Sequence, residues 1–140
     1  MEQLSAEIAE RMRPFGEAIE RLETIPGVGR RTAEAILAEI GPEMSRFRTY
    51  RHLASWAGMC PGNDQSRGKR QSGKTTKGNP WLRAALVEAA HAAGRARNTY
   101  LSAQYRRLTS RRGKKRAAVA VGHTILVIAY YLSTPALIWL

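Results

Sequence analysis

The sequence predicts an all-α protein of about six helices, in which a tight hairpin of two helices precedes a small helical bundle with a long basic loop. Three observations support this prediction. Apolar residues recur at spacings of three and four along most of the 140-residue chain, as on the buried face of a helix. No stretch of useful length alternates apolar and polar residues as a strand would. Glycine and proline fall between the periodic segments, where they end helices.

The first periodic segment covers residues 1–23. Its apolar positions form one stripe, and Pro14 should kink or split the helix near Arg13. We assign residues 1–21 to an N-terminal helix. Its stripe is either part of the core or the stub of a longer coiled coil, and the segment is too short to decide between the two.

Residues 22–41 (LETIPGVGRRTAEAILAEIG) contain two helical segments joined by the turn IPGVG, with the second helix over about residues 30–40. This pattern resembles the helix-hairpin-helix motif of DNA-binding and repair proteins. Glycines allow such a turn, and the free amides that begin the second helix can face a phosphate. The alternative is an ordinary tight turn between two helices. The predicted phosphate-contacting residues are Gly27, Gly29, Arg30 and Arg31.

Residues 45–58 predict a short helix from about Thr49 to Ala57, which Gly58 ends. We assign its aromatic residues to the core. Nearby arginines are candidates for further phosphate contacts. The aromatic residues are Phe47, Tyr50 and Trp56, and the arginines are Arg46, Arg48 and Arg51.

A basic loop rich in serine and glycine is predicted for residues 59–79. Loops of more than about 12 to 15 residues inside a compact domain are uncommon, and they are usually functional or disordered. Glycines let the backbone approach phosphate and cations neutralise it, so this loop suits a polyanion. Its candidate DNA-binding residues are Arg67, Lys69, Arg70, Lys74 and Lys77, and its hydroxyls include Ser66 and Ser72.

The string GKRQSGKT within this loop matches the phosphate-binding pattern of NTPases, G-x-x-x-x-G-K-T. That pattern requires a buried strand before it and a helix that starts at its lysine. Here the polar string PGNDQSR precedes it, and Gly78 and Pro80 follow almost at once. We therefore reject NTP binding.

Residues 80–133 predict the helical bundle, with Asn79 as the N-cap of its first helix and Pro80 in the first turn. A helix over about residues 98–109 leads into a second basic block, and an uncharged helix over residues 117–132 closes the fold. That last helix is short for a bilayer, so we expect a core helix and no membrane partner. Residues 134–140 form an atypical tail. The cations assigned to DNA in the second block are Arg111, Arg112, Lys114, Lys115 and Arg116.

Charge is unevenly distributed along the chain, whose net charge is +12. Residues 1–43 hold nine acidic and five basic residues, and the rest of the chain holds two acidic and 18 basic residues. This asymmetry favours a nucleic-acid face in the C-terminal two thirds. A single cysteine excludes an internal disulfide, and no metal site or signal peptide is apparent, so we expect a cytoplasmic protein.

With these residues in view, the sequence resembles the C-terminal transposase domain of the insertion-sequence 110/116/902 transposase family. The resemblance covers about residues 22–131. Its marks are the IPGVG hairpin, the late basic block leading into AVAVGHTILVIAYYL, and the string LASWAGMCPGNDQSRGKRQSGKTTKGNPWLRAAL. The last string is the most specific of the three.

The resemblance implies a serine nucleophile, acting together with a RuvC-like domain whose acidic residues bind magnesium. The family pattern places that serine at Ser66, but Arg67 separates it from Gly68, which leaves Ser72 as the alternative. The resemblance also implies DNA as substrate, and a guide RNA and a homo-oligomer as further partners. Only Asp64 and Glu88 are acidic after residue 43, so no cofactor is expected in this chain, and magnesium only with the acidic domain.

The sequence thus predicts the DNA-binding, serine-bearing domain of an insertion-sequence transposase. Because the acidic set is missing and the C-terminal STPALIWL departs from the family pattern, we expect a fragment or a decayed copy that binds nucleic acid without recombining DNA alone. The alternative is a non-catalytic nucleic-acid-binding module that uses the hairpin and the basic blocks. A third and weaker interpretation is a basic membrane-associated peptide.

Overall fold

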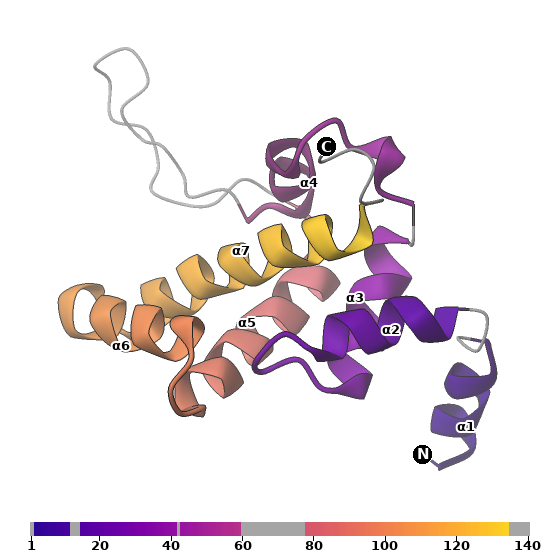
Figure 1. The fold of residues 1–140 in the computed structure, drawn as a ribbon, viewed down its shortest axis with the longest axis horizontal. Helices are drawn as coiled ribbons and strands as arrows, with labels where there is room; N and C mark the ends of the chain where they lie inside the picture. The colour runs from indigo at the N-terminus through magenta and orange to yellow at the C-terminus, as the bar shows by residue number, and fades with distance from the viewer. Residues whose placement is uncertain (1, 12–14, 42, 60–77, 135–140) are drawn as a thin grey trace.

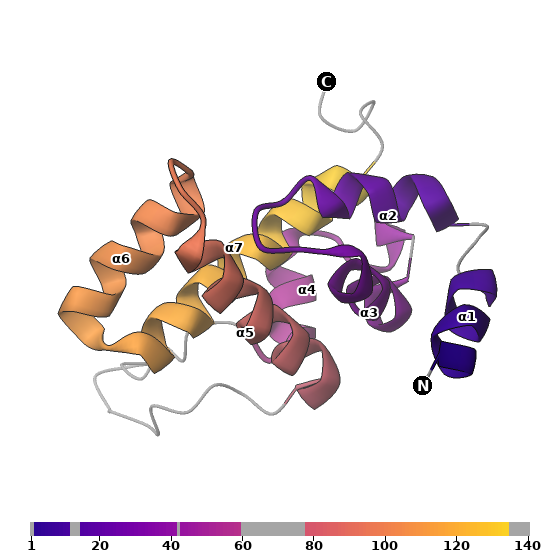
Figure 2. The same ribbon diagram turned by 90° about the horizontal axis from the view of Figure 1, so that it is seen from below.

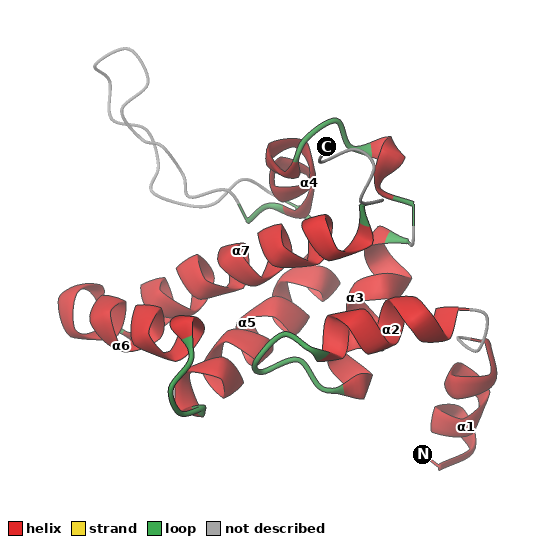
Figure 3. Cartoon of the chain, viewed as in Figure 1, coloured by secondary structure: helices red, strands yellow, loops and turns green. Residues whose placement is uncertain are grey.

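The computed structural model describes residues 2–11, 15–41, 43–59 and 78–134 of the chain, and within these residues it consists of helices joined by turns and loops, without a strand (Figures 1 and 3). The all-α prediction is confirmed. The first helices are α1 (Glu2–Arg11), α2 (Gly16–Glu23), α3 (Arg30–Ile40), the 3-10 turn η2 (Met44–Arg46) and α4 (Tyr50–Ala57). The bundle helices are α5 (Pro80–Arg95), α6 (Tyr100–Arg112) and α7 (Lys114–Ser133).

The N-terminal periodic segment forms two helices rather than one. Helix α1 ends at Arg11 and α2 begins at Gly16, on either side of Pro14, as the missing amide of proline requires. Helix α1 lies beside the main body at one end of the molecule (Figures 1 and 2). Leu4 and Ile8 in α1 are 57% and 38% exposed, whereas Ile19 and Leu22 in α2 are buried in the core. The predicted stripe is therefore core in α2 and exposed in α1.

The turn between α2 and α3 is held close to α5. Ile25 and Val28 are buried, and the Val28 amide donates to the Ile25 carbonyl at 3.0 Å. Gly27 lies between them with φ of +89°, and a Cβ added there would come 2.6 Å from the Ala93 amide nitrogen of α5. Both the backbone angle and the lack of space therefore require glycine at this position.

Helices α5, α6 and α7 pack on one another, and α2, α3 and α4 rest on this layer. Helix α3 covers α5, while α2 and α4 both contact α7 (Figure 2). Small residues on the facing surfaces allow close approach of the helices, and larger aliphatic residues fill the space between them. The buried residues of α5 and α7 include Leu82, Leu86, Ala89, Ala90, Ala93, Ala118, Val121, Ile125, Leu126 and Ala129.

Side-chain caps explain where the bundle helices begin. The Asn79 side chain accepts hydrogen bonds from the amides of Trp81 and Leu82 at 3.0 and 3.1 Å, which confirms the predicted N-cap of α5. Helix α6 begins at Tyr100 because Thr99 and Ser102 form a reciprocal capping box. The predicted start at residue 98 was therefore two residues early.

The connection between η2 and α4 is tied to α7 by one buried hydroxyl. Tyr130 of α7 donates to the Phe47 carbonyl at 3.1 Å and to the Arg48 carbonyl at 3.3 Å. Phe47 is buried as predicted, but Trp56 of α4 is 41% exposed. The assignment of all the aromatic residues of this region to the core was therefore wrong for Trp56.

Helix α7 begins three residues earlier than predicted, at Lys114, within the basic block. It is long and apolar enough to cross a membrane by length and composition, and it is the one described helix that meets this test. Eight of its residues are buried inside the protein, from Ala117 to Tyr130. This burial is what the sequence predicted for a core helix.

The crowding at Gly27 predicts a large effect of a small substitution. Gly27→Ala should lower the free energy of unfolding by about 3 kcal/mol, because the methyl group would strike α5 and alanine resists a positive φ. Denaturant unfolding measures this value. Gly16→Ala is the control, since nothing lies within 4 Å of a Cβ placed on Gly16 and alanine favours helix. Equal stability of the two variants would contradict the packing described for the turn.

A second prediction concerns His123 in the middle of α7, where burial lowers the pKa of the imidazole below 6.5. The unfolded chain then binds the proton before the folded protein does as pH falls. The free energy of unfolding should therefore decline below about pH 6.5. Thermal unfolding at pH 7.5 and 5.5 tests this, with His123→Gln expected to flatten the decline. His52→Gln, at an exposed position, is the control, and an unaltered decline in His123→Gln would refute the assignment.

Candidate nucleic-acid interface

The N-terminus of α3 presents unpaired backbone amides. Its N-cap, Gly29, has extended backbone with φ of −87° and makes no side-chain cap hydrogen bond. Nothing lies within 4 Å of a Cβ placed on Gly29, so the space in front of this turn is open. An uncapped helix N-terminus carries partial positive charge and free N–H donors, which suit an anionic oxygen. Of the two predicted glycines, Gly29 faces this open space and Gly27 faces α5.

The two arginines of this turn are paired within the chain. The Arg30 guanidinium lies 3.8 Å from Glu23 and 3.4 Å from Glu34, and Arg31 donates to the Ser5 hydroxyl of α1 at 2.7 Å. The Arg30 side chain is 56% exposed, with Glu23 36% and Glu34 14% exposed, and ion pairs with so exposed a partner contribute little to stability. A phosphate can therefore compete for either arginine at small cost.

The junction of α6 and α7 holds the densest positive charge among the described residues, and we call it the basic tip. Gly113 ends α6 and begins α7, so two runs of cations meet around a single residue. All of these cations are exposed. The basic tip consists of Arg111, Arg112, Lys114, Lys115 and Arg116.

Helix electrostatics do not account for all of this charge. Arg111 and Arg112 lie in the last turn of α6, where cations complement the helix dipole. Residues 114–116 occupy the first turn of α7, which has no side-chain cap and where cations oppose the dipole. Three like charges at a positive helix end cost stability, so an external anion is the natural counterpart of the basic tip.

The predicted loop residues Ser66, Ser72, Arg67, Lys69, Arg70, Lys74 and Lys77 lie outside the described residues. The two described ends of this segment lie side by side. Met59 is fully buried and its amide donates to the Ala54 carbonyl at 2.9 Å. Gly78 approaches the backbone of Ala57 and Gly58 so closely that a Cβ on it would overlap their atoms. The two described residues that flank this segment, Met59 and Gly78, therefore both lie at the end of α4.

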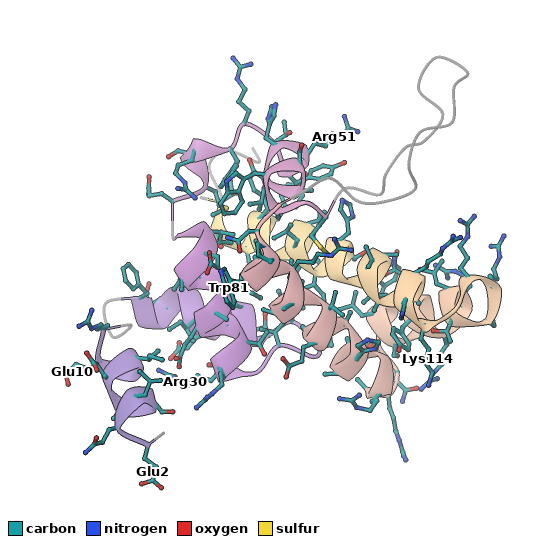
Figure 4. The ribbon with its side chains drawn as sticks, turned by 180° about the vertical axis from the view of Figure 1, so that it is seen from behind. Glu2, Glu10, Arg30, Arg51, Trp81 and Lys114 are labelled. Atoms are coloured by element: carbon teal, nitrogen blue, oxygen red, sulfur yellow. The ribbon has the colours of Figure 1, made fainter. Side chains whose placement is uncertain are left out.

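The basic tip and the α3 N-terminus lie apart from each other. In Figure 4, Arg30 lies at the same end of the molecule as Glu2 and Glu10, while Lys114 lies toward the opposite end. The structure therefore does not bring the two sets of predicted phosphate contacts together. The acidic helix α1 lies at the hairpin end, and Lys114 of the basic tip lies toward the other end (Figure 4).

Two features of this surface were not recognised in the sequence. Trp56 and Trp81 are 41% and 74% exposed, although large apolar rings are usually covered. Helical periodicity cannot reveal this exposure, because Trp56 falls three residues after the buried Leu53 in an apolar pattern.

Among the described residues, no group of three His, Cys, Asp or Glu side chains gathers to hold a metal ion.

Comparison with known proteins places this fold and surface in a family. Residues 19–107 match the family described as Transposase IS116/IS110/IS902, and the chain belongs to this family. The matched residues contain the α2–α3 turn and most of α6, while the basic tip follows them.

Two relatives illustrate the family. The chain is 33% identical over 112 residues to the pilin gene-inverting protein of Moraxella bovis, an alignment that covers 78% of this chain and 34% of the relative. It is 32% identical over 122 residues to the transposase for insertion sequence element IS1111A of Coxiella burnetii, covering 84% of this chain and 33% of the relative. The chain thus spans about a third of the length of these relatives.

The basic tip generates a prediction about salt dependence. Replacing Lys114 and Lys115 with Gln should weaken DNA binding and reduce the slope of log K against log salt by about 0.9 for each phosphate that is no longer neutralised. Titration of a labelled duplex at several salt concentrations measures this slope. Arg11→Gln with Arg21→Gln is the matched control, because it removes the same charge from exposed positions on α1 and α2.

The thermal unfolding midpoint of the Lys114/Lys115 variant should stay the same or rise, since cations at that helix end oppose the dipole. Weaker binding cannot then be ascribed to unfolding. An equal change of slope in the Arg11/Arg21 control would show that only net charge matters, and it would remove the basic tip as a specific contact.

Proposed function

We propose that this chain is the DNA-binding, serine-bearing domain of an insertion-sequence transposase, which acts in DNA transposition together with a RuvC-like domain. The observation that carries the proposal is the family match over residues 19–107, joined directly to an exposed cluster of cations without matching carboxylates. Transposition requires contact with DNA, and a cluster of this kind supplies sequence-independent attraction to the phosphate backbone.

The α2–α3 turn acts in this proposal as a helix-hairpin-helix phosphate contact. Its uncapped amides and the open space at Gly29 support that role. Arg30 and Arg31 would exchange their partners on α1, α2 and α3 for a phosphate. The basic tip lies apart from this turn, so the two would contact different parts of a bound DNA (Figure 4).

Strand cleavage is assigned to a serine of the loop, with Ser66 as the nucleophile and Ser72 as the alternative. The hydroxyl gives up its proton to a base, its oxygen bonds to phosphorus, and the bond from phosphorus to one strand end breaks. The departing strand oxygen takes up a proton, and the phosphoserine link keeps the energy of the phosphodiester for rejoining. Cations of the loop would offset the charge that gathers on the phosphoryl oxygens. These are Arg67, Lys69, Arg70, Lys74 and Lys77.

We assign magnesium to the RuvC-like domain, because Asp64 and Glu88 are the only acidic residues after residue 43 of this chain. A guide RNA and a second copy of the chain are further proposed partners, and a cytoplasmic setting is proposed from the composition. The chain alone is expected to bind DNA without producing recombined strands.

A non-catalytic binding module is the second candidate function. The uncapped α3 terminus and the basic tip favour it, since both suit phosphate and neither requires a nucleophile. The two candidates predict different products on the same DNA.

The test uses supercoiled plasmid incubated with the protein, a separately supplied RuvC-like domain and magnesium, followed by denaturation and a search of the DNA for covalent attachment of this chain. We expect adducts with the parent chain and with Ser72→Ala, and none with Ser66→Ala. Retention of DNA binding by all three proteins, measured separately, shows that the serine acts in chemistry. DNA binding with no adduct from any of them would refute the catalytic role and favour the binding module.

A further inference from the structure

Trp56 presents part of its ring to solvent beside an arginine that the fold holds in place. The Arg46 guanidinium carbon lies 5.9 Å from the Trp56 ring centroid and 5.0 Å from that of Phe47. The same guanidinium donates to the Ile40 carbonyl at 2.9 Å. Phe47 packs against Trp56 with ring centroids 5.6 Å apart. Both groups therefore have restricted positions before any ligand arrives.

Trp81 is more exposed, although it sits on a well-formed helix start. Its amide donates to the Asn79 side chain, and Asn79 in turn donates to the Glu39 carboxylate at 2.6 Å. The backbone beneath Trp81 is thus fixed while the ring is 74% exposed (Figure 4). Leaving a tryptophan in water gives up the free energy that its burial would provide, so packing does not explain this residue.

The close approach of Gly78 to α4 brings these two tryptophans onto one part of the molecule. Trp56 directly precedes Ala57, which Gly78 touches, and Trp81 follows Gly78 by three residues. With about 3.8 Å between successive Cα atoms, the two Cα atoms lie within about 20 Å of each other. We call Arg46, Trp56 and Trp81 together the tryptophan surface.

The charge around α4 favours an anionic partner. Arg51 stacks on Tyr50 at 5.6 Å, and Arg48 is exposed beside it. Within the described part of the chain, none of the ion pairs involves Arg46, Arg48 or Arg51. These three arginines outnumber the two nearby carboxylates, of which Glu39 accepts from Asn79 and Glu43 from Ser45. Aromatic faces among such arginines match a ligand that combines flat rings with negative charge.

We propose that the tryptophan surface binds single-stranded DNA by stacking on its unpaired bases, a role that rests on the proposed transposase function and extends it. Exposed rings favour a single strand over a duplex, because a duplex keeps its base faces stacked on each other. DNA is the strand chosen, because the family is one of DNA transposases. The surface would hold an unpaired strand beside the end of α4, where Gly78 lies against Ala57 and Gly58.

The test compares binding of a labelled oligo-dT of about 20 nucleotides with binding of a duplex of equal length. Trp81→Ala and Trp56→Ala should each weaken oligo-dT binding by about tenfold and change duplex binding by less than about twofold. Trp56→Phe should retain most of the affinity, because phenylalanine still offers a ring face. An unchanged thermal unfolding midpoint of Trp56→Phe shows that this variant is folded when its binding is measured.

Tyr100→Ala is the matched control, since Tyr100 is 70% exposed and begins α6, beyond the far end of α5. The 16 residues of α5 span about 24 Å, which separates Tyr100 from the tryptophan surface. This variant should bind oligo-dT as the parent chain does.

The inference is overturned if the tryptophan variants lose no more affinity than Tyr100→Ala, or if they lose duplex binding equally. It is also overturned if oligo-U of the same length depends on the tryptophans more strongly than oligo-dT. If duplex binding depends on the basic tip but the tryptophan variants bind oligo-dT as the parent chain does, this inference is rejected and the proposed function is not. Failure of the chain to bind any DNA would reject the proposed function as well.

Discussion

The burial of one face of α7 against α5 and α6 is the contact on which the rest of the structure depends. Helices α2 and α4 rest on the same helix, and Tyr130 fixes the connection that enters α4. From Ala117 onward α7 has no Asp, Glu, Lys or Arg, so much of its surface must be covered, and α2, α4, α5 and α6 contact it here. Every proposed contact surface is positioned by this packing.

Helix α7 also joins the core to the exterior. Its body is apolar and buried, but its first turn carries three cations into solvent beside Gly113. A rigid helix therefore holds the basic tip at a constant distance from the core, which suits a contact that must position DNA. The acidic residues of α1 lie toward the opposite end of the molecule, so the electrostatic field has a direction along the long axis (Figure 4).

Much of the fold was predictable because the controlling interactions are local. The split at Pro14, the bounds of α3 and the Asn79 cap all follow from residues within one or two turns of the feature. The starts of α6 and α7 were misplaced by two and three residues, and these are local errors. The error in burial arose where distant contacts decide. Trp56 was assigned to the core, and nothing in its own segment shows that α7 leaves it uncovered. The site was less predictable for the same reason: the cations were found, but their separation into two ends was not.

The sequence by itself determined the helical class, the family and the identity of the charged residues, since these depend on composition, spacing and motif. Only the tertiary structure decided that Gly27 faces α5 while Gly29 faces open space, and that Gly78 closes onto the end of α4. The reason is physical: helix periodicity states which side of a helix is apolar, but neighbouring helices determine how much of that side is buried. Exposure of Trp56 and Trp81 is a property of the packed protein, and no single segment encodes it.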